Sequence, residues 1–344
     1  MSTPQLNIVK NQSLKAYNTF GIDVKANYFC EIDSQAQLFQ LFNTDEYLNS
    51  ANKLFLGGGS NILFTQDYAG IVIKVGIKGI RIDNNDENII WVNVGAGENW
   101  HDFVLFCIEN GLAGVENLSL IPGTVGAAPI QNIGAYGVEL KDVLEGVEAI
   151  EMNNGLIKKF NAHDLKLGYR ESIFKHEAKG KFIITSVTFK LSRVPTFNVS
   201  YGAINAKLEQ NEIKELSIKA ISDVVIQIRK SKLPNPAEIG NAGSFFKNPS
   251  IAITKILALQ KAYPTIPNYP IDEHTTKIAA GWLIEQCGWK GKRVGNTGVH
   301  KDQALVLVNY GGASGLEIWN LAQEIIASVD VKFGIKLTPE VNVV

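Results

Sequence analysis

One stretch of 22 residues without a charge, Asn117 to Val138, constrains this fold more than any other feature of the sequence. Its length would suit a membrane-spanning helix. Its content does not, because it holds Pro122, Pro129 and four glycines, which interrupt a helix. The segment therefore predicts a looping backbone of small residues inside a folded protein.

Length and charge narrow the class of protein. The chain has 344 residues, enough for two or three domains, with 33 basic and 34 acidic residues. A dedicated nucleic-acid binder has a basic excess, so we expect no nucleic-acid partner. The three cysteines, Cys30, Cys107 and Cys287, form no Cys-x-x-Cys pair and predict buried thiols in a reducing compartment. Residues 1–20 lack a continuous apolar segment, so we expect a cytoplasmic protein with no membrane partner.

Strand and helix patterns alternate irregularly, which predicts an α+β fold. Ser34 and Gln37 predict a capping box before a helix, and Asn84-Asn85 predicts a turn. The strongest strand signals lie at 54–56, 71–75, 89–94, 147–152, 156–160, 182–191 and 304–308. Helical spacing begins at Glu98 and recurs at 218–232, 253–261 and 276–286, and in a last stripe of Leu316, Trp319, Ala322, Ile326 and Val329.

Three glycine-rich clusters could bind a pyrophosphate through backbone N–H groups: 57–61, 122–128 and 134–137. None matches Gly-x-Gly-x-x-Gly or the P-loop, the two commonest nucleotide signatures. A single cluster is more often a tight turn. Two long clusters flanked by strands make a phosphate cradle a stronger interpretation.

The histidines indicate no metal chemistry. His101, His163, His176, His274 and His300 form no short metal-binding spacing, so we expect no metal site and surface positions for all five. Gly-x-Ser-x-Gly is missing too, which disfavours a serine hydrolase.

Four further segments carry more polar chemistry than packing needs: 168–175, 229–232, 240–249 and 339–341. Each has a plain structural explanation when taken alone. Cations at the end of a helix, for example, complement its dipole. Composition cannot join these segments into one site.

Together, however, the motifs resemble the bacterial UDP-N-acetylenolpyruvoylglucosamine reductases, first of the two family types. The resemblance runs in order from about Tyr17 to Val341. It rests on NTFGID (18–23), GGGSN (57–61), IPGTVGAAPIQNIGAYGVEL (121–140), GYRESIFK (168–175), KLPNP (232–236), GNAGSFFKNP (240–249), AAGWLIEQCGWKG (279–291), HKDQALVLVN (300–309) and PEV (339–341). The chain departs from many relatives at Asn342, where they carry a basic residue, and has only three residues after PEV.

The resemblance implies three domains. Residues 1–78 and 79–236 would be two subdomains of a vanillyl-alcohol-oxidase-like (PCMH-type) FAD-binding unit, with residues 341–344 as a candidate return to the first. Residues 237–340 would be an α+β substrate-binding domain.

The resemblance also implies an oxidoreductase of peptidoglycan synthesis, a flavoprotein serving cell-wall biogenesis, cell shape and division. NADPH would reduce non-covalently bound FAD and leave. UDP-N-acetylenolpyruvoylglucosamine would then bind and be reduced to UDP-N-acetylmuramate. We expect a monomer that works with these small molecules alone.

Hydride addition to the enolpyruvyl methylene leaves negative charge on the adjacent carbon and its carboxylate, so a cation and donors must face it. The resemblance assigns Arg170 and Glu340 to the carboxylate and Ser244 to proton donation. A second anion would repel the charge, so we expect Glu340 to act as a neutral acid or to be ordered by Arg170.

Other positions match residues that bind substrate or cofactor in the family. Substrate would be held by Tyr201, Lys232, Asn248 and Gln303, and Arg229 would serve FAD or the substrate phosphates. FAD would be cradled by Gly57, Gly58, Gly59, Ser60, Asn61, Pro122, Gly123, Thr124, Gly126, Ala127, Asn132, Gly134, Ala135, Tyr136 and Gly137.

Two alternatives stay open at this point. One is a flavoprotein oxidase of the same superfamily, which often tethers FAD through His or Cys, although no histidine lies in these glycine loops. The other is a non-catalytic protein that binds a UDP-sugar.

Overall fold

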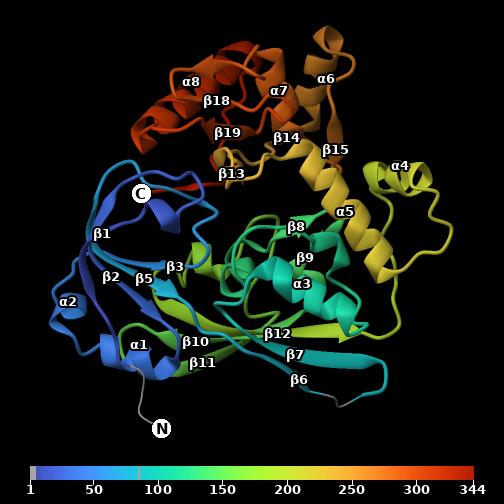
Figure 1. The fold of residues 1–344 in the computed structure, drawn as a ribbon. Helices are drawn as coiled ribbons and strands as arrows, with labels where there is room; N and C mark the ends of the chain where they lie inside the picture. Colours follow the sequence, from blue (N-terminus) through green and yellow to red (C-terminus); the bar gives the residue numbers. More distant parts are fainter. Residues whose placement is uncertain (1–4, 84–85) are drawn as a thin grey trace. The chain divides into compact units, whose positions relative to one another are not determined.

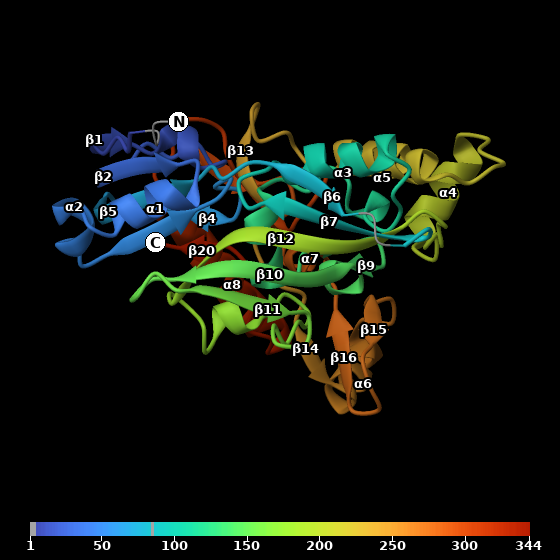
Figure 2. The ribbon, with the colours of Figure 1, turned by 90° about the horizontal axis from the view of Figure 1, so that it is seen from below.

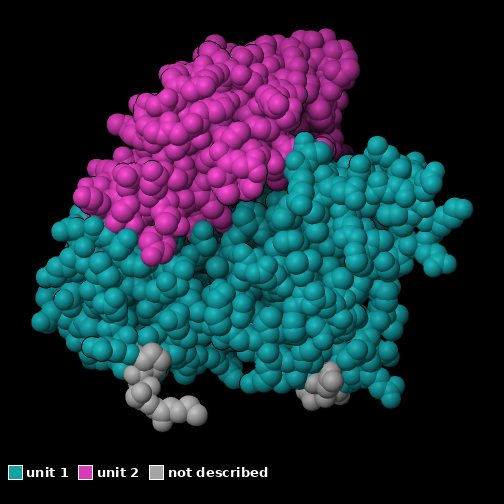
Figure 3. Space-filling model, in the orientation of Figure 1, with its two compact units in different colours: residues 1–12, 26–58, 69–231 teal, residues 13–25, 59–68, 232–344 magenta. Residues whose placement is uncertain are grey.

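A computed structural model describes residues 5–83 and 86–344, which divide into two compact units (Figure 3). Unit 1 comprises residues 1–12, 26–58 and 69–231, and unit 2 comprises 13–25, 59–68 and 232–344. The chain passes from one unit to the other between Gly58 and Gly59, inside a predicted cofactor loop. The three domain ranges expected from the resemblance stay a prediction, and so does the turn at Asn84-Asn85, which lies outside the described residues.

The larger sheet of unit 1 is antiparallel and has five strands (Figure 2). Its order is β11 (Ile157–Asn161), β10 (Leu144–Glu151), β12 (Phe182–Ser192), β7 (Ile89–Gly95) and β6 (Ile80–Asp83). The strands predicted at 89–94, 147–152, 156–160 and 182–191 are confirmed. Gly155 makes the β10–β11 turn possible with a φ of +72°.

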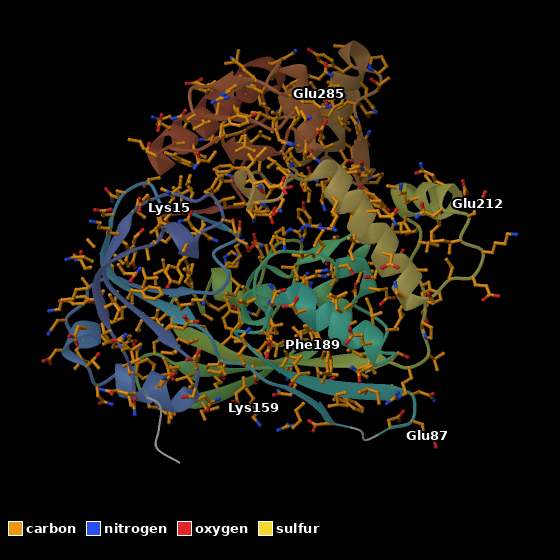
Figure 4. All side chains as sticks on the ribbon, in the orientation of Figure 1. Lys15, Glu87, Lys159, Phe189, Glu212 and Glu285 are labelled. Carbon is orange, nitrogen blue, oxygen red and sulfur yellow. The ribbon has the colours of Figure 1, made fainter. Side chains whose placement is uncertain are left out.

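Helix α3 (Trp100–Glu109) packs against this sheet through aromatic side chains. The Phe189 ring of β12, labelled in Figure 4, lies 4.6 Å from that of Phe103 and 5.9 Å from that of Trp100. The helix begins two residues after the predicted Glu98, because Asn99 caps it by accepting the His101 and Asp102 N–H groups.

The second sheet of unit 1 has the order β1 (Val9–Ser13), β2 (Lys25–Ile32), β5 (Tyr68–Val75) and β3 (Lys53–Leu56). Helices α1 (Gln35–Leu41) and α2 (Asp45–Leu48) connect β2 to β3 (Figure 1). Ser34 caps α1 as predicted by accepting the Gln37 N–H, while Gln37 Oε1 accepts the N–H of Asp33. The Gln37 side chain thus caps one residue earlier than a capping box requires.

Helices α4 (Gly202–Gln210) and α5 (Ile218–Lys232) form a small satellite core. Ile204 and Leu208 of α4 cluster with one apolar face of α5, made by Ile221, Val224, Val225 and Ile228. The bounds of α5 match the prediction, because this apolar face is regular and Leu233-Pro234 ends it.

Unit 2 contains two small sheets, a further pair of short strands and three α-helices. One sheet has the order β13 (Gly240–Ser244), β19 (Val306–Asn309), β18 (Thr297–Val299) and β17 (Arg293–Val294). The other has the order β14 (Ser250–Ala252), β16 (Thr275–Ile278) and β15 (Asn268–Pro270). The helices are α6 (Ile253–Ala262), α7 (Ala280–Gln286) and α8 (Gly315–Phe333), and β4 (Ile62–Leu63) pairs in parallel with β20 (Asn342–Val343).

Two helix predictions in unit 2 need correction. The segment 276–286 begins as strand β16, because Thr275, Thr276 and Ile278 are β-branched, and helix α7 starts only at Ala280. The stripe on α8 is also shifted, since Leu316 is exposed and Ile318, Leu321 and Ile325 join the buried face. The helix itself ends as predicted, with Gly334 in the left-handed conformation.

The uncharged segment is a series of turns, as its composition predicts. It contains parts of the 3₁₀ helices η2 (Glu116–Leu118) and η3 (Val125–Gln131), followed by the short strands β8 (Gly134–Ala135) and β9 (Val138–Glu139). Further 3₁₀ turns are η1 (Lys15–Tyr17), η4 (Leu140–Asp142) and η5 (Ile173–Lys175). Within residues 5–83 and 86–344, no helix has both the length and the apolar content to span a bilayer. Mixed sheets with separate helices make the fold α+β, as predicted.

Candidate functional site

Two of the predicted glycine loops meet in unit 1. A Cβ on Gly58 would lie 2.9 Å from Gly123 Cα, and one on Gly57 would lie 2.4 Å from Thr124 Oγ1. The two backbones therefore touch where no side chain could fit. Local spacing could not have shown this contact, because more than 60 residues separate the loops along the chain.

The start of helix α3 holds the second loop in place. The Trp100 N–H donates to Gly123 O at 3.1 Å, and the Val125 N–H donates to Glu98 O at 2.9 Å. Gly126 N–H donates to Ala96 O at 2.8 Å, and Gly126 lies so close to Ala96 that an added Cβ would meet its Cβ at 2.5 Å. Three backbone hydrogen bonds thus fix the loop between Gly123 and Gly126.

A cavity of about 340 Å³ opens beside these loops in unit 1. Four predicted cofactor residues line it: Gly57, Thr124, Gly126 and Ala127. The rest of its wall is largely apolar and was not predicted, including Leu56, Ala96, Ile130, Phe174, Phe182 and Ile184. Small residues beside flat apolar walls fit a planar ring of the kind found in FAD.

Arg170 is held by the other end of the uncharged segment. Its Nη2 donates to Gly134 O at 2.9 Å, and its Nη1 donates to Asn132 O at 3.4 Å. The Asn132 side chain is fully buried, donates to Gly168 O and Glu139 Oε2, and accepts the Lys141 N–H. Asn132 and Arg170 both have positive φ, +45° and +57°. These bonds fix the loop that presents the guanidinium.

A second arginine lies near Arg170. Arg229 of α5 donates from Nε to Leu120 O at 3.1 Å and hydrogen-bonds the Tyr136 side chain. Burial lowers the pKa of Arg229, and the positive charge of Arg170 lowers it further. Because the positive charge of Arg170 disfavours the charged form of Arg229, an anion bound near both would be stabilised.

Two tyrosines flank this cationic corner. The Tyr136 and Tyr201 rings are perpendicular with centroids 5.2 Å apart. Tyr136 has a φ of +50°, and burial raises its pKa. Asn117 donates to Tyr136 O, and Asn198 donates to Gly137 O. Predicted cofactor residues and the predicted substrate residue Tyr201 are therefore neighbours in unit 1.

Unit 2 carries the rest of the first glycine loop and ties it to the C-terminal segment. Thr19 N–H donates to Gly59 O at 3.0 Å, and Ser60 follows Gly59. Asn61 Nδ2 donates to Glu340 O at 3.4 Å, and Asn61 O accepts both the backbone and the side-chain N–H groups of Asn342. The side chain of Asn342 thus makes a local contact to the loop.

Ser244 and Glu340, 96 residues apart in the chain, are brought together in the same unit. Ser244 ends β13 opposite Val306, after a bulge at which Gly243 has a φ of +68°. The next residue, Phe245, accepts the Glu340 N–H at 2.8 Å, and Phe246 forms a bridge with Pro339. The backbone therefore places the two segments that carry these predicted catalytic residues side by side.

The remaining predicted substrate residues divide into a pair and a single residue. Asn248 Oδ1 accepts the Ala280 N–H at the start of α7. A Cβ on the next residue, Gly281, would lie 3.3 Å from Gln303 Oε1. Asn248 and Gln303 thus meet at one helix end, whereas Lys232 is exposed at the end of α5.

Two histidines and one cysteine differ from expectation. His300 is only 8% exposed, and His101 is half-buried, with Nδ1 accepting the Leu120 N–H at 3.0 Å. Both were predicted at the surface. No local signal marks them, since their burial comes from distant segments. Cys30 and Cys107 are buried as predicted, but Cys287 is half-buried.

Comparison with known proteins decides the family. A domain model described as "FAD binding domain" matches residues 47–161, and one described as "UDP-N-acetylenolpyruvoylglucosamine reductase, C-terminal domain" matches 235–344. A protein of Amoebophilus asiaticus named UDP-N-acetylenolpyruvoylglucosamine reductase is 55% identical over 98% of this chain and 100% of its own. The chain belongs to the UDP-N-acetylenolpyruvoylglucosamine reductase family.

Other members of the reductase family agree over the full length. The Flavobacterium johnsoniae protein of the same name is 49% identical over 98% of this chain and 100% of its own. The crystal structure of the Thermus caldophilus reductase superposes with a TM-score of 0.65 at 25% identity, covering 98% of each chain. This chain is therefore an FAD-dependent oxidoreductase, and the resemblance stated from its motifs is confirmed.

Proposed function

We propose that this protein reduces UDP-N-acetylenolpyruvoylglucosamine to UDP-N-acetylmuramate, with NADPH as the reductant, for peptidoglycan synthesis. The observation that carries the proposal is the 55% identity to a relative of that name across 98% of the chain. The pairing of the Ser244 and Glu340 segments supports it, because the two proposed catalytic residues come together from distant parts of the sequence.

Bound FAD supplies the hydride, which it takes from NADPH and gives to the methylene carbon of the enol ether. Its diphosphate and ring would be held by the predicted glycine-loop residues: Gly57, Gly58, Gly59, Ser60, Asn61, Pro122, Gly123, Thr124, Gly126, Ala127, Asn132, Gly134, Ala135, Tyr136 and Gly137. The touching loops and the apolar cavity support this assignment. We expect the cofactor to be bound without a covalent bond.

Arg170 stabilises the negative charge that develops on the substrate's carboxylate. A guanidinium can form two parallel hydrogen bonds to a carboxylate, and it stays charged throughout the reaction. Its hold on Gly134 O and Asn132 O means that little reorganisation is needed when the charge appears. Glu340 in its neutral form donates a hydrogen bond to the same carboxylate.

Ser244 donates the proton that completes the reduction, adding to the carbon next to the carboxylate. The bulge before it, with Gly243 in the left-handed conformation, shifts the register so that Ser244 ends β13 opposite Val306. A hydroxyl is a weak acid, so the proton must be replaced promptly from water or a neighbouring cation.

Four residues would bind the UDP-sugar. Lys232 supplies a mobile positive charge for phosphate, and Tyr201 supplies an aromatic ring. Asn248 and Gln303 supply amide groups at the start of α7. Arg229 serves a diphosphate of either FAD or the substrate. We expect a monomer in the cytoplasm.

Turnover of the purified protein tests the proposal. We expect a yellow protein that oxidises NADPH only when UDP-N-acetylenolpyruvoylglucosamine is present and yields a product heavier by a hydride and a proton. Acid denaturation should release all the flavin. Flavin left on the chain, together with oxygen consumption, would favour an oxidase. A colourless protein that holds UDP-sugars without oxidising NADPH would favour a binding protein.

A further inference from the structure

A chain of hydrogen bonds in unit 1 connects His101, a residue with no assigned role, to Arg229. His101 Nδ1 accepts the N–H of Leu120 at 3.0 Å. The carbonyl of the same Leu120 accepts Nε of Arg229 at 3.1 Å. The N–H of Leu120 thus binds the His101 side chain, and its carbonyl binds the Arg229 side chain.

Leu120 adopts a backbone conformation that leucine avoids. Its φ is +58°, in the left-handed region, although it carries a branched side chain. Such a residue stays in place only where its surroundings hold it. His101 provides one such restraint, and Leu120 directly precedes Ile121-Pro122, the entrance to the predicted cofactor loop.

The environment of His101 suits an acceptor at Nδ1. Accepting an N–H requires the neutral ring with its proton on Nε2. Burial lowers the pKa of His101, the charges of Arg229 and Lys230 lower it further, and only Asp102 acts in the opposite direction. His101 also lies in the first turn of α3, where the helix dipole disfavours a positive charge.

We propose that His101 is a positioning residue that holds Leu120 in its left-handed conformation, so that the Leu120 carbonyl aims the Arg229 guanidinium at a bound diphosphate. The ligand class is a nucleoside diphosphate ester, which both FAD and a UDP-sugar contain. The proposal rests on the proposed function only through the assignment of Arg229 to such a diphosphate.

Two substitutions at position 101 separate positioning from packing. His101→Asn keeps an acceptor, since its Oδ1 is attached to Cγ as Nδ1 is, whereas His101→Leu keeps apolar volume and removes the acceptor. The exposed His163 provides a matched control, His163→Leu. The probes are FAD added to apoprotein, followed by flavin fluorescence, and UDP added to holoenzyme, followed by calorimetry.

We expect His101→Leu to weaken the binding of one of the two probes, FAD or UDP, by about tenfold. That is the scale of one lost hydrogen bond of good geometry. His101→Asn should stay within about threefold of wild type, and His163→Leu should not differ from it. The probe that weakens identifies which diphosphate Arg229 holds. The proposal would be overturned if His101→Leu and His101→Asn lost equal affinity for a probe, or if neither variant lost any.

A double-mutant cycle with Arg229→Gln shows whether His101 acts through Arg229. Once Arg229 is replaced, His101→Leu should weaken the same probe by no more than about twofold further. If His101→Leu still weakens probe binding by the full tenfold in the Arg229→Gln variant, its role is structural and the proposal is overturned. This comparison holds even if His101→Leu also lowers the melting temperature. If Arg229→Gln alone changes neither probe, the inference is also wrong, while the turnover assay still decides the reductase function on its own.

Discussion

The backbone N–H of Glu340 donates to the carbonyl oxygen of Phe245 at 2.8 Å, so the C-terminal segment runs beside the residue that follows Ser244. The Asn61 side chain donates to Glu340 O as well. Three stretches that are remote in the sequence, around residues 61, 244 and 340, therefore support one another within unit 2.

The contact between glycine loops predicts unequal costs for two similar substitutions. In Gly58→Ala the new methyl group meets Gly123 backbone, which cannot rotate away, so we expect a loss of about 1–3 kcal/mol in stability and weaker FAD binding. Gly57→Ala meets the Thr124 hydroxyl, which can turn, and should cost less. Gly202→Ala is the control, with no atom within 4 Å, and should be neutral or stabilising. Urea unfolding and FAD titration measure these effects, and equal costs at 57 and 58 would contradict the packing argument.

The buried Asn132 predicts a coupled loss of stability and turnover. Asn132→Ala removes three hydrogen bonds and places alanine at a φ of +45°, so we expect a loss of about 2–4 kcal/mol. The catalytic rate should also fall, because the Arg170 loop loses its anchor. Asn110→Ala, at an exposed helix end, should cost under about 1 kcal/mol. Chemical unfolding and steady-state kinetics check both effects. Full activity in Asn132→Ala would show that the loop holds Arg170 without this anchor.

The two sequestered histidines predict instability in acid. Burial is the main cause that lowers the pKa of His101 and of His300 below the ordinary 6.5. Near and below pH 6.5 these two histidines are therefore protonated to a greater extent in the unfolded chain than in the folded protein. Stability should be greatest above that pH and fall as the pH drops toward 5. In His101→Asn the unfolding free energy should fall less steeply with decreasing pH than in wild type. The difference in slope should correspond to up to about one proton fewer taken up on unfolding. An unchanged slope would show that His101 titrates normally in the folded protein.

The proposed neutral state of Glu340 predicts that an amide can replace it. Glu340→Gln keeps a donor toward the substrate carboxylate, so we expect it to retain the rate within about tenfold, whereas Glu340→Ala should lose about 10²–10³-fold. Steady-state rates with saturating substrate measure the difference. Equal loss in the two variants would mean that the ionised carboxylate is needed.

Local pattern was enough to predict several of the regular elements. The apolar face of α5 and the Pro that follows it determine the whole of 218–232, and Asn153-Asn154-Gly155 determines the β10–β11 hairpin. The segment 276–286 is predicted as one helix, but its first residues pair with β14 and β15 as strand β16, and the sequence does not reveal those neighbouring strands.

The candidate site was predicted only in part, because its geometry depends on contacts between distant segments. The motifs marked Arg170, Ser244 and Glu340, but no periodicity reveals that Phe245 and Glu340 are hydrogen-bonded. The sequence predicts His101 at the surface, because nothing local marks its partner, the Leu120 N–H, which lies 19 residues further along the chain. The apolar wall of the cavity, including Phe174 and Ile184, is built from strands and turns that have other neighbours in the sequence.

Stopped-flow absorbance of the flavin in wild type and Ser244→Ala tests the central claim most directly, with the exposed Ser250→Ala as control. In all three proteins NADPH should bleach the flavin at similar rates. On adding UDP-N-acetylenolpyruvoylglucosamine, colour should return quickly in wild type and in Ser250→Ala, and about 10²–10⁴-fold more slowly in Ser244→Ala. If the wild-type flavin stays bleached, or if Ser244→Ala slows both phases equally, the account of a reductase that protonates its substrate through Ser244 is contradicted.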